Sequence, residues 1–403
     1  MKRILLYIIF TVCASLAADA QNPLKALKNM LEQPSEPRFD DKAFAGKPLS
    51  KKDAESAATM IYQYVVQNDS ARRNGFIEAK ALLHGKYRMP FTYKIFGDKP
   101  ADGRSLYISM HGGGNTSDEV NNKQWQNQMR LYAPKEGVYF VPRSAVNDWN
   151  MWFQPHVDTL FDLIIQTAVA EWDVNPDKVY LMGYSAGGDG AYRLAPRLAD
   201  RWAAASMMAG HPGGVSPVNL RNIGFMLWMG AEDKAYDRNL QAAKFGKLLD
   251  DLREADTAAY RHETHIVAGK GHWMEHADTV AVPWMAQFRR NPCPDKVVWR
   301  QDDVPHDSFY WLSVPANEAT EGKCATVERR GNTFTVSRND YKRLTIGLND
   351  NMIDFRKPVK IIVNGNTVFD AKVERTIIDI YHSITKRKDK GLIFHAFIEI
   401  NIF

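Results

Sequence analysis

The sequence predicts an α/β domain with a doubly wound, mostly parallel sheet, followed by a smaller antiparallel β-domain. Three observations predict this organisation. From about residue 90, short apolar runs alternate with helical patterns, as in consecutive β–α–β units. Most of these runs are almost continuously apolar, which is typical of strands buried on both faces of a parallel sheet. After about residue 295 the helical patterns stop, and short strand-like runs alternate with turns.

The α/β domain is expected to span residues 90–294. Its strands are predicted at 91–96, 105–110, 138–141, 178–182, 204–208, 225–229 and 265–267. Its helices are predicted at about 157–172, 187–199, 239–255 and 278–289. Apolar and polar residues alternate more in the first run than in the others, so we expect it to form an edge strand.

Two further segments flank this domain. Residues 21–89 are polar, with apolar residues at helical spacing and a break at Gly75, and we expect them to form helices that pack on the main domain. Residues 295–403 are expected to form the antiparallel β-domain. Within them, Asn364-Gly365 between two apolar runs is a strong signal for a hairpin turn.

The N-terminus has the pattern of an export signal. Two basic residues precede the apolar run 4–12, and the A-D-A triplet at 18–20 matches a cleavage site. The apolar run is shorter than the ~20 residues that span a bilayer. Cys13 would suggest a lipoprotein, but Val12 stands where a small residue is expected. The sequence therefore predicts a signal peptide at 1–20 and a secreted or periplasmic protein.

Composition excludes several classes of protein. The 403 residues are 45% hydrophobic and 11% aromatic, which is a globular composition. The net charge of +5 is dispersed, apart from the short run 386–388, and this argues against nucleic-acid binding. After the N-terminal run, no segment is apolar enough to span a membrane. Export would leave Cys293 and Cys324, and the sequence leaves open whether they form a disulfide.

The motif G-Y-S-A-G places Ser185 between a predicted strand and a predicted helix. Gly183 and Gly187 flank the serine, and this strand–turn–helix context is the one that a nucleophilic serine on a sharp turn requires. A glycine-rich turn without chemistry is the alternative reading. Because a serine hydroxyl is a weak nucleophile, the catalytic reading also requires a base and an acid.

An aspartate and a histidine follow in the order that this motif predicts. Asp233 and His272 each come just after a predicted strand, at the edge where a parallel sheet has its active site. We expect His272 to act as the general base and Asp233 to orient it. The other residues considered for these two roles are Glu232, Asp237, His211, His262, His265 and His276.

The segment S-M-H-G-G-G-N follows the second predicted strand. Such a loop can supply backbone N–H groups to an oxyanion, and we expect Gly112 and Gly113 to do so together with the N–H of Ala186. Aromatic residues are expected to contact the substrate at Trp149, Trp152 and Trp273, although Trp149 and Trp152 could equally pack within the rim. No H-E-x-x-H, paired C-x-x-C or phosphate-binding motif is present, so we expect no metal site and no nucleotide-binding site.

Residues 107–274 resemble the α/β-hydrolase superfamily. More narrowly, this segment looks like exported esterases akin to polyhydroxybutyrate depolymerase, feruloyl esterase and dienelactone hydrolase. Its phrase V-Y-L-M-G-Y-S-A-G-G-D-G-A-Y-R-L-A-P-R-L-A-D-R-W-A-A-A-S-M-M-A-G-H-P-G-G is similar to a bacterial branch of hydrolases with a small C-terminal β-domain. The resemblance implies a Ser–Asp–His triad at Ser185, Asp233 and His272 and no cofactor. It covers about half of the chain and is a poor guide to the substrate.

The leading hypothesis is a secreted carboxylic ester hydrolase that forms an acyl-enzyme. Its substrate would be a small-molecule or polymer-attached ester, with no nucleic-acid partner, no membrane span and an undetermined oligomeric state. A serine peptidase of the prolyl-oligopeptidase type is an alternative, although too little chain precedes the α/β region for a large β-propeller. A glycan-binding or surface-binding protein on a hydrolase scaffold is another alternative.

Overall fold

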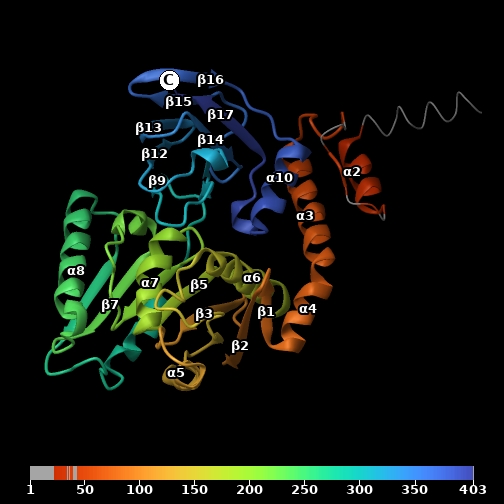
Figure 1. The fold of residues 1–403 in the computed structure, drawn as a ribbon. Coiled ribbons are helices and arrows are strands. Elements are labelled where there is room, and N and C mark those ends of the chain that lie inside the picture. Colours follow the sequence, from red (N-terminus) through yellow and green to blue (C-terminus); the bar gives the residue numbers. More distant parts are fainter. Residues whose placement is uncertain (1–21, 34, 36, 40–42, 403) are drawn as a thin grey trace, which may run out of the picture.

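The computed structural model describes residues 22–33, 35, 37–39 and 43–402 (Figure 1). The predicted signal peptide and Cys13 lie outside the described residues. Within the described part of the chain, no helix is long and apolar enough to cross a membrane. Cys293 and Cys324 are both unpaired thiols.

The main sheet has eight strands in the order β1-β2-β4-β3-β5-β6-β7-β8. Their bounds are β1 (Ala81–His84), β2 (Tyr87–Phe96), β3 (Arg104–Met110), β4 (Gly137–Pro142), β5 (Val174–Tyr184), β6 (Ala204–Met208), β7 (Gly224–Gly230) and β8 (His262–Val267). Strands β3 to β8 are parallel, whereas β2 runs antiparallel to β4 and β1 antiparallel to β2. The predicted doubly wound, mostly parallel sheet is confirmed.

The expectation that residues 91–96 form an edge strand is confirmed, since they pair with β4 on one side and β1 pairs only with residues 87–90 of β2. These residues belong to β2, and the chain turns back before them at Gly85, where φ is +55°. The resulting hairpin adds β1 outside β2. Because β1 ends beside residue 90, the rest of β2 has a strand on one side only, which agrees with the partial exposure of its residues.

Helices cover both faces of this sheet, because successive side chains along each strand point to opposite faces. They are α5 (Asp118–Leu131), α6 (Pro155–Glu171), α7 (Ala186–Arg197), α8 (Arg238–Ala255) and α9 (Ala281–Met285). Helices α6, α7 and α8 share one apolar core with alternate strand residues, and α5 and α9 pack into the core on the other face. The sequence analysis predicted no helix at α5, since that segment is mostly polar.

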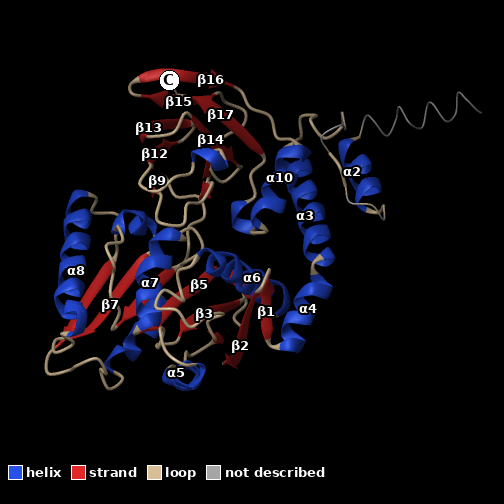
Figure 2. Cartoon of the chain, in the orientation of Figure 1, coloured by secondary structure: helices blue, strands red, loops and turns tan. Residues whose placement is uncertain are grey.

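The C-terminal part forms two further sheets, drawn as red strands in Figure 2. The first has the order β10-β11-β14-β17 and the second the order β16-β15-β13-β12-β9. Their bounds are β9 (Lys296–Arg300), β10 (Ser308–Phe309), β11 (Leu312–Ser313), β12 (Cys324–Arg330), β13 (Thr333–Asn339), β14 (Arg343–Leu348), β15 (Val359–Val363), β16 (Asn366–Ala371) and β17 (Ala396–Asn401). The pairing is antiparallel as predicted, except that β13 and β15 are parallel.

The C-terminal part also contains helix α10 (Ile377–Arg387), which the sequence analysis did not predict. Its buried residues Ile377, Ile380 and Ile384 recur at helical spacing and pack against the first two of the three N-terminal helices. The three are α2 (Pro23–Leu31), α3 (Lys51–Asn68) and α4 (Ser70–Ala79). Figure 1 shows α3 beside α10 and α4 beside β1, so the N-terminal helices contact both parts of the molecule.

A buried ionic network joins the C-terminal part to the α/β sheet. The Asp200 carboxylate, which follows α7, accepts hydrogen bonds from Arg201 and from Arg387 of α10, both at 2.6 Å. Burial alone would raise the pKa of Asp200, but the charges of these two arginines hold that pKa well below its ordinary value. Because loss of Arg387 would leave part of the buried Asp200 charge unpaired, this ion pair holds α10 against the α/β domain.

Candidate active site

The turn at Ser185 is strained, and its glycines are required by close packing. Ser185 has φ +57° and ψ −121°, a conformation that L-residues rarely adopt. A Cβ at Gly183 would overlap the Gly187 carbonyl, and a Cβ at Gly187 would overlap the Met110 carbonyl. The turn projects Ser185 from the C-terminal end of β5 into the first turn of α7. This is the sharp strand–turn–helix context that the motif predicts.

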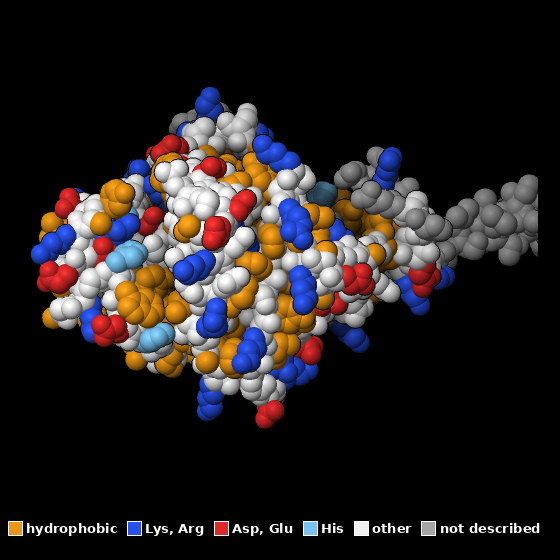
Figure 3. Space-filling view, turned by 60° about the horizontal axis from the view of Figure 1, so that its bottom comes forward, with side chains coloured by type: hydrophobic (Ala, Val, Ile, Leu, Met, Phe, Trp, Pro, Cys, Tyr) orange, Lys and Arg blue, Asp and Glu red, His pale blue; other side chains and the backbone are white. Residues whose placement is uncertain are grey.

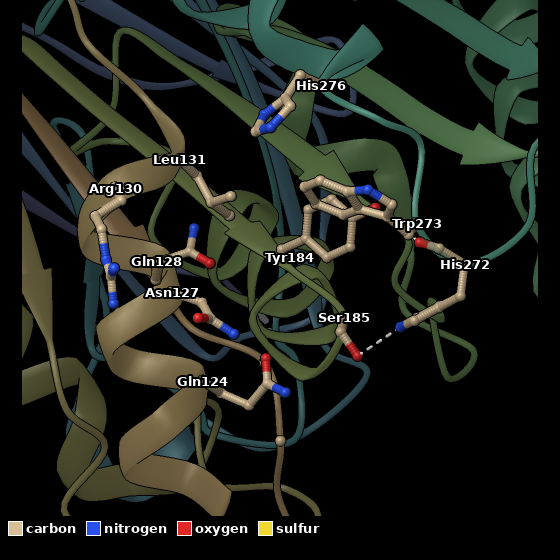
Figure 4. Close-up of a pocket in the computed structure, with 12 residues that line it drawn as sticks. Gln124, Asn127, Gln128, Arg130, Leu131, Tyr184, Ser185, His272, Trp273 and His276 are labelled. Atoms are coloured by element: carbon tan, nitrogen blue, oxygen red, sulfur yellow. Dashed lines mark hydrogen bonds between the residues drawn. The ribbon is translucent and has the colours of Figure 1, made fainter.

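A continuous chain of hydrogen bonds links Ser185, His272 and Asp233. His272 Nε2 lies 2.9 Å from Ser185 Oγ (Figure 4), and on the other side of the ring His272 Nδ1 lies 2.6 Å from Asp233 Oδ2. The Asp233 side chain is only 3% exposed. Since an ionised carboxylate can only accept, the proton belongs on Nδ1, and Nε2 is left to accept the Ser185 proton.

The competing acids and bases lie elsewhere. Glu232 and Asp237 are both exposed, and Glu232 pairs with Lys234 at 3.0 Å. Among the histidines, His262 contacts Asp250, and His265 stacks on Trp228 and contacts Glu263. His211 and His276 line cavities beside Ser185 without contacting it. The residues joined by hydrogen bonds at this site are therefore Ser185, His272 and Asp233, which the sequence analysis favoured.

The glycine loop after β3 passes directly beside Ser185. A Cβ at Gly112 would lie 3.1 Å from the Ser185 Cβ, and Gly113 has φ +106°, which favours glycine. Ala186 is the first residue of α7, so its N–H has no acceptor within that helix. The structure thus brings together all three predicted oxyanion residues around the Ser185 hydroxyl.

Two buried polar side chains that the sequence analysis missed hold this loop. Asn121 of α5 is fully buried; its Oδ1 accepts the Gly114 N–H at 2.9 Å, and its Nδ2 donates to two carbonyls that precede α5. His111 Nδ1 contacts the Gly112 carbonyl at 2.6 Å, while its Nε2 accepts the Ser144 N–H. Burial lowers the pKa of His111 to about 3, so the ring is neutral. Neither Asn121 nor His111 has a local signal in the sequence beyond its nearness to the glycines.

Of the three tryptophans that were predicted to bind the substrate, two line cavities and one is buried in the core. Trp149 is 65% exposed and Trp273 is 46% exposed, and each lines a cavity beside Ser185. Trp152 is fully buried, and its indole N–H donates to the His111 carbonyl at 2.8 Å. The prediction that Trp152 contacts the substrate is wrong, because its ring fills the core beneath the glycine loop.

Two cavities open on either side of Ser185. The larger, of about 750 Å³, lies between α5 and the segment that carries His272, Trp273 and His276. The smaller, of about 410 Å³, is lined by aromatic residues together with Asp189, Arg193 and Arg238. On the face shown in Figure 3, hydrophobic side chains gather beside histidines. A molecule bound at Ser185 therefore has room on two sides of the serine hydroxyl.

Asp189, four residues after Ser185, accepts a hydrogen bond from the His211 N–H at 2.6 Å. Burial raises the pKa of Asp189 from 3.8 to about 6, so between these values the folded protein retains a proton that the unfolded chain loses. The free energy of unfolding should therefore fall as the pH rises through this window, by up to about 3 kcal/mol.

We expect Asp189→Asn to remove that dependence. The free energy of unfolding of the variant should exceed that of wild type only slightly at pH 4. The difference should grow until about pH 6 to 7, since only wild type bears the buried charge. Chemical denaturation at several pH values measures this difference. A stability difference that stays constant from pH 4 to pH 7 would contradict the shift.

Within the described part of the chain, no group of three or more His, Cys, Asp or Glu side chains is placed to hold a metal ion.

Comparison with solved structures finds esterases. A thermostable esterase is 17% identical with a TM-score of 0.40, covering 52% of this chain and 62% of that chain. A ferulic acid esterase is 18% identical with a TM-score of 0.39, covering 51% of this chain and 96% of that chain. The Bacillus cereus carboxylesterase is 16% identical with a TM-score of 0.37, covering 49% and 94%. No protein-family model matches the chain, and neither does any curated protein.

The fold is assigned from the chain's own features. The order of the sheet, the sharp turn at Ser185 after β5, and the positions of Asp233 after β7 and His272 after β8 agree with one architecture. The chain has the α/β-hydrolase fold, with C-terminal antiparallel sheets appended to it.

Proposed function

We propose that this protein is an exported carboxylic ester hydrolase with Ser185 as nucleophile, His272 as general acid and base, and Asp233 as the group that orients His272. The observation that supports the proposal most directly is the hydrogen-bond chain from Asp233 through His272 to Ser185 at the mouth of an open cavity. Export is inferred from the N-terminal sequence pattern alone.

In the first half of the reaction, Ser185 Oγ attacks the ester carbonyl carbon while His272 Nε2 takes the hydroxyl proton. Negative charge develops on the carbonyl oxygen, where the N–H groups of Gly112, Gly113 and Ala186 would stabilise it. The bond to the alcohol oxygen then breaks, and His272 returns its proton to that oxygen. This leaves an acyl group on Ser185.

In the second half, water attacks the acyl carbon and His272 takes a proton from it. The bond to Ser185 Oγ then breaks, Oγ recovers its proton from His272, and the free acid leaves. Asp233 stays ionised throughout and stabilises the imidazolium that forms in each half.

The proposal is tested with a fluorophosphonate probe and a series of 4-nitrophenyl esters of increasing acyl length. We expect the mature protein to hydrolyse at least one ester, and peptide mapping to find the phosphonyl group on Ser185. Labelling on a different serine would overturn the assignment of the nucleophile. If the protein showed neither labelling nor turnover, the proposal of a serine hydrolase would fail.

A further inference from the structure

The larger cavity has two chemically different walls. Figure 4 shows Gln124, Asn127 and Gln128 of α5 on one side and Tyr184, Trp273 and His272 on the other, with Ser185 between them. Positions 124, 127, 128 and 131 follow helical spacing, so their side chains share one face of α5. Three of these four residues are amides, where the cavity of an enzyme for long acyl chains would carry aliphatic side chains.

The amides differ in how much of their hydrogen-bonding capacity is already used. Gln128 is buried, and its Nε2 donates to Ser109 Oγ at 2.8 Å. Within the described part of the chain, the side chains of Gln124 and Asn127 make no hydrogen bond. Each of these two amides offers two donors and an acceptor toward the cavity.

The opposite wall supplies a flat apolar surface. Trp273 is 46% exposed, and its ring is supported by Tyr184 at 5.7 Å and by His276 at 5.0 Å between centroids. Tyr184 is fixed in turn, since its hydroxyl donates to the His272 carbonyl and accepts the Met274 N–H. An indole face opposite amide groups suits a ring that has apolar C–H faces and hydroxyls at its edge.

The position of His272 decides which half of the ester enters this cavity. The leaving oxygen must receive its proton from His272 Nε2, so the alcohol half has to leave on the His272 side of Ser185. His272 lines the larger cavity and not the smaller one. The alcohol half therefore faces the amides of α5, and the acyl half faces the smaller cavity.

We propose that the alcohol released by this enzyme is a sugar, bound between Trp273 and the amides of Gln124 and Asn127. This inference rests on the proposed function and specifies its substrate class. The reaction breaks the bond between the acyl carbon and one sugar oxygen, and that oxygen takes the proton from His272. Other hydroxyls of the sugar ring would form hydrogen bonds with the side-chain amides of Gln124 and Asn127.

The test compares esters of one acid with different alcohols. The acid is the one best accepted in the 4-nitrophenyl series, and the alcohols are methyl β-xyloside, methyl β-glucoside and n-hexanol. We expect wild type to have at least a tenfold higher kcat/KM for a sugar ester than for the hexyl ester. The double variant Gln124→Leu, Asn127→Leu should lower that ratio about tenfold, mainly through KM, because two hydrogen bonds are lost.

Gln126→Leu is the matched control. Gln126 is an exposed amide on the same helix that does not line the cavity, so its substitution should leave the ratio unchanged. Melting temperatures of all variants show whether folding is preserved. If the double variant does not fold, the single variant Asn127→Leu is compared with wild type in its place.

Either of two results would overturn the inference while the proposed function stands: hydrolysis with no preference for the sugar esters, or a ratio unaffected by loss of the amides. The absence of both ester hydrolysis and fluorophosphonate labelling would overturn the proposed function and this inference together.

Discussion

Ser185→Ala is expected to lower kcat for the best 4-nitrophenyl ester by about 10⁶-fold and to abolish fluorophosphonate labelling. The variant has no oxygen at the end of the hydrogen-bond chain, so no acyl-enzyme can form. The remaining activity would come from substrate binding and the N–H groups of the glycine loop. Steady-state kinetics and probe labelling of purified wild type and variant measure both effects.

The fold should survive this substitution. Alanine experiences the same backbone strain as serine at φ +57°, and the hydroxyl it removes is not part of the core. We therefore expect a nearly unchanged melting temperature. Ser337→Ala, an exposed position on β13, is the control and should retain full activity. A Ser185→Ala protein that is folded and still turns over esters at the wild-type rate would exclude Ser185 as nucleophile.

Asp233→Asn is expected to lower kcat by about 10⁴-fold with a much smaller effect on KM. An asparagine at this position can donate its amide N–H to His272 Nδ1. The ring proton then moves to Nε2, which can no longer accept the proton of Ser185. The triad keeps its geometry in this variant but has the wrong tautomer.

The matched control for this substitution is the neighbouring acid. Glu232→Gln changes an exposed carboxylate that contacts only Lys234, and its activity should stay within about twofold of wild type. If Glu232→Gln lowered kcat as much as Asp233→Asn does, the negative charge of the loop after β7 would matter rather than the tautomer of His272.

Local sequence predicted the elements whose conformation is set by neighbouring residues. The short apolar runs form strands of the main sheet, as is typical of segments that are buried between two layers of helices. Asn364 and Gly365 form the tight turn between β15 and β16, with φ of +49° and +82°. The nucleophile turn was also predictable, since Gly183 and Gly187 permit the close packing around Ser185.

Other features could not be predicted from local sequence. Helix α5 has few apolar residues, because one of its faces lines the cavity and another holds the glycine loop through Asn121. Strand β1 and helix α10 depend on pairing with β2 and packing with α3. The boundaries assigned to the domains from sequence stay a prediction, although residues 81–89 belong to β1 and β2 rather than to a helix.

By itself, the sequence determined which residue types are available for chemistry and in what order they occur along the sheet. This was possible because strand ends and glycine turns are encoded over a few residues. Only the tertiary structure decided which side chains face the site. Trp152 is buried beneath His111 while Trp149 is exposed, although the two are three residues apart. Their orientation depends on contacts between segments distant in the chain, and such contacts leave no local pattern.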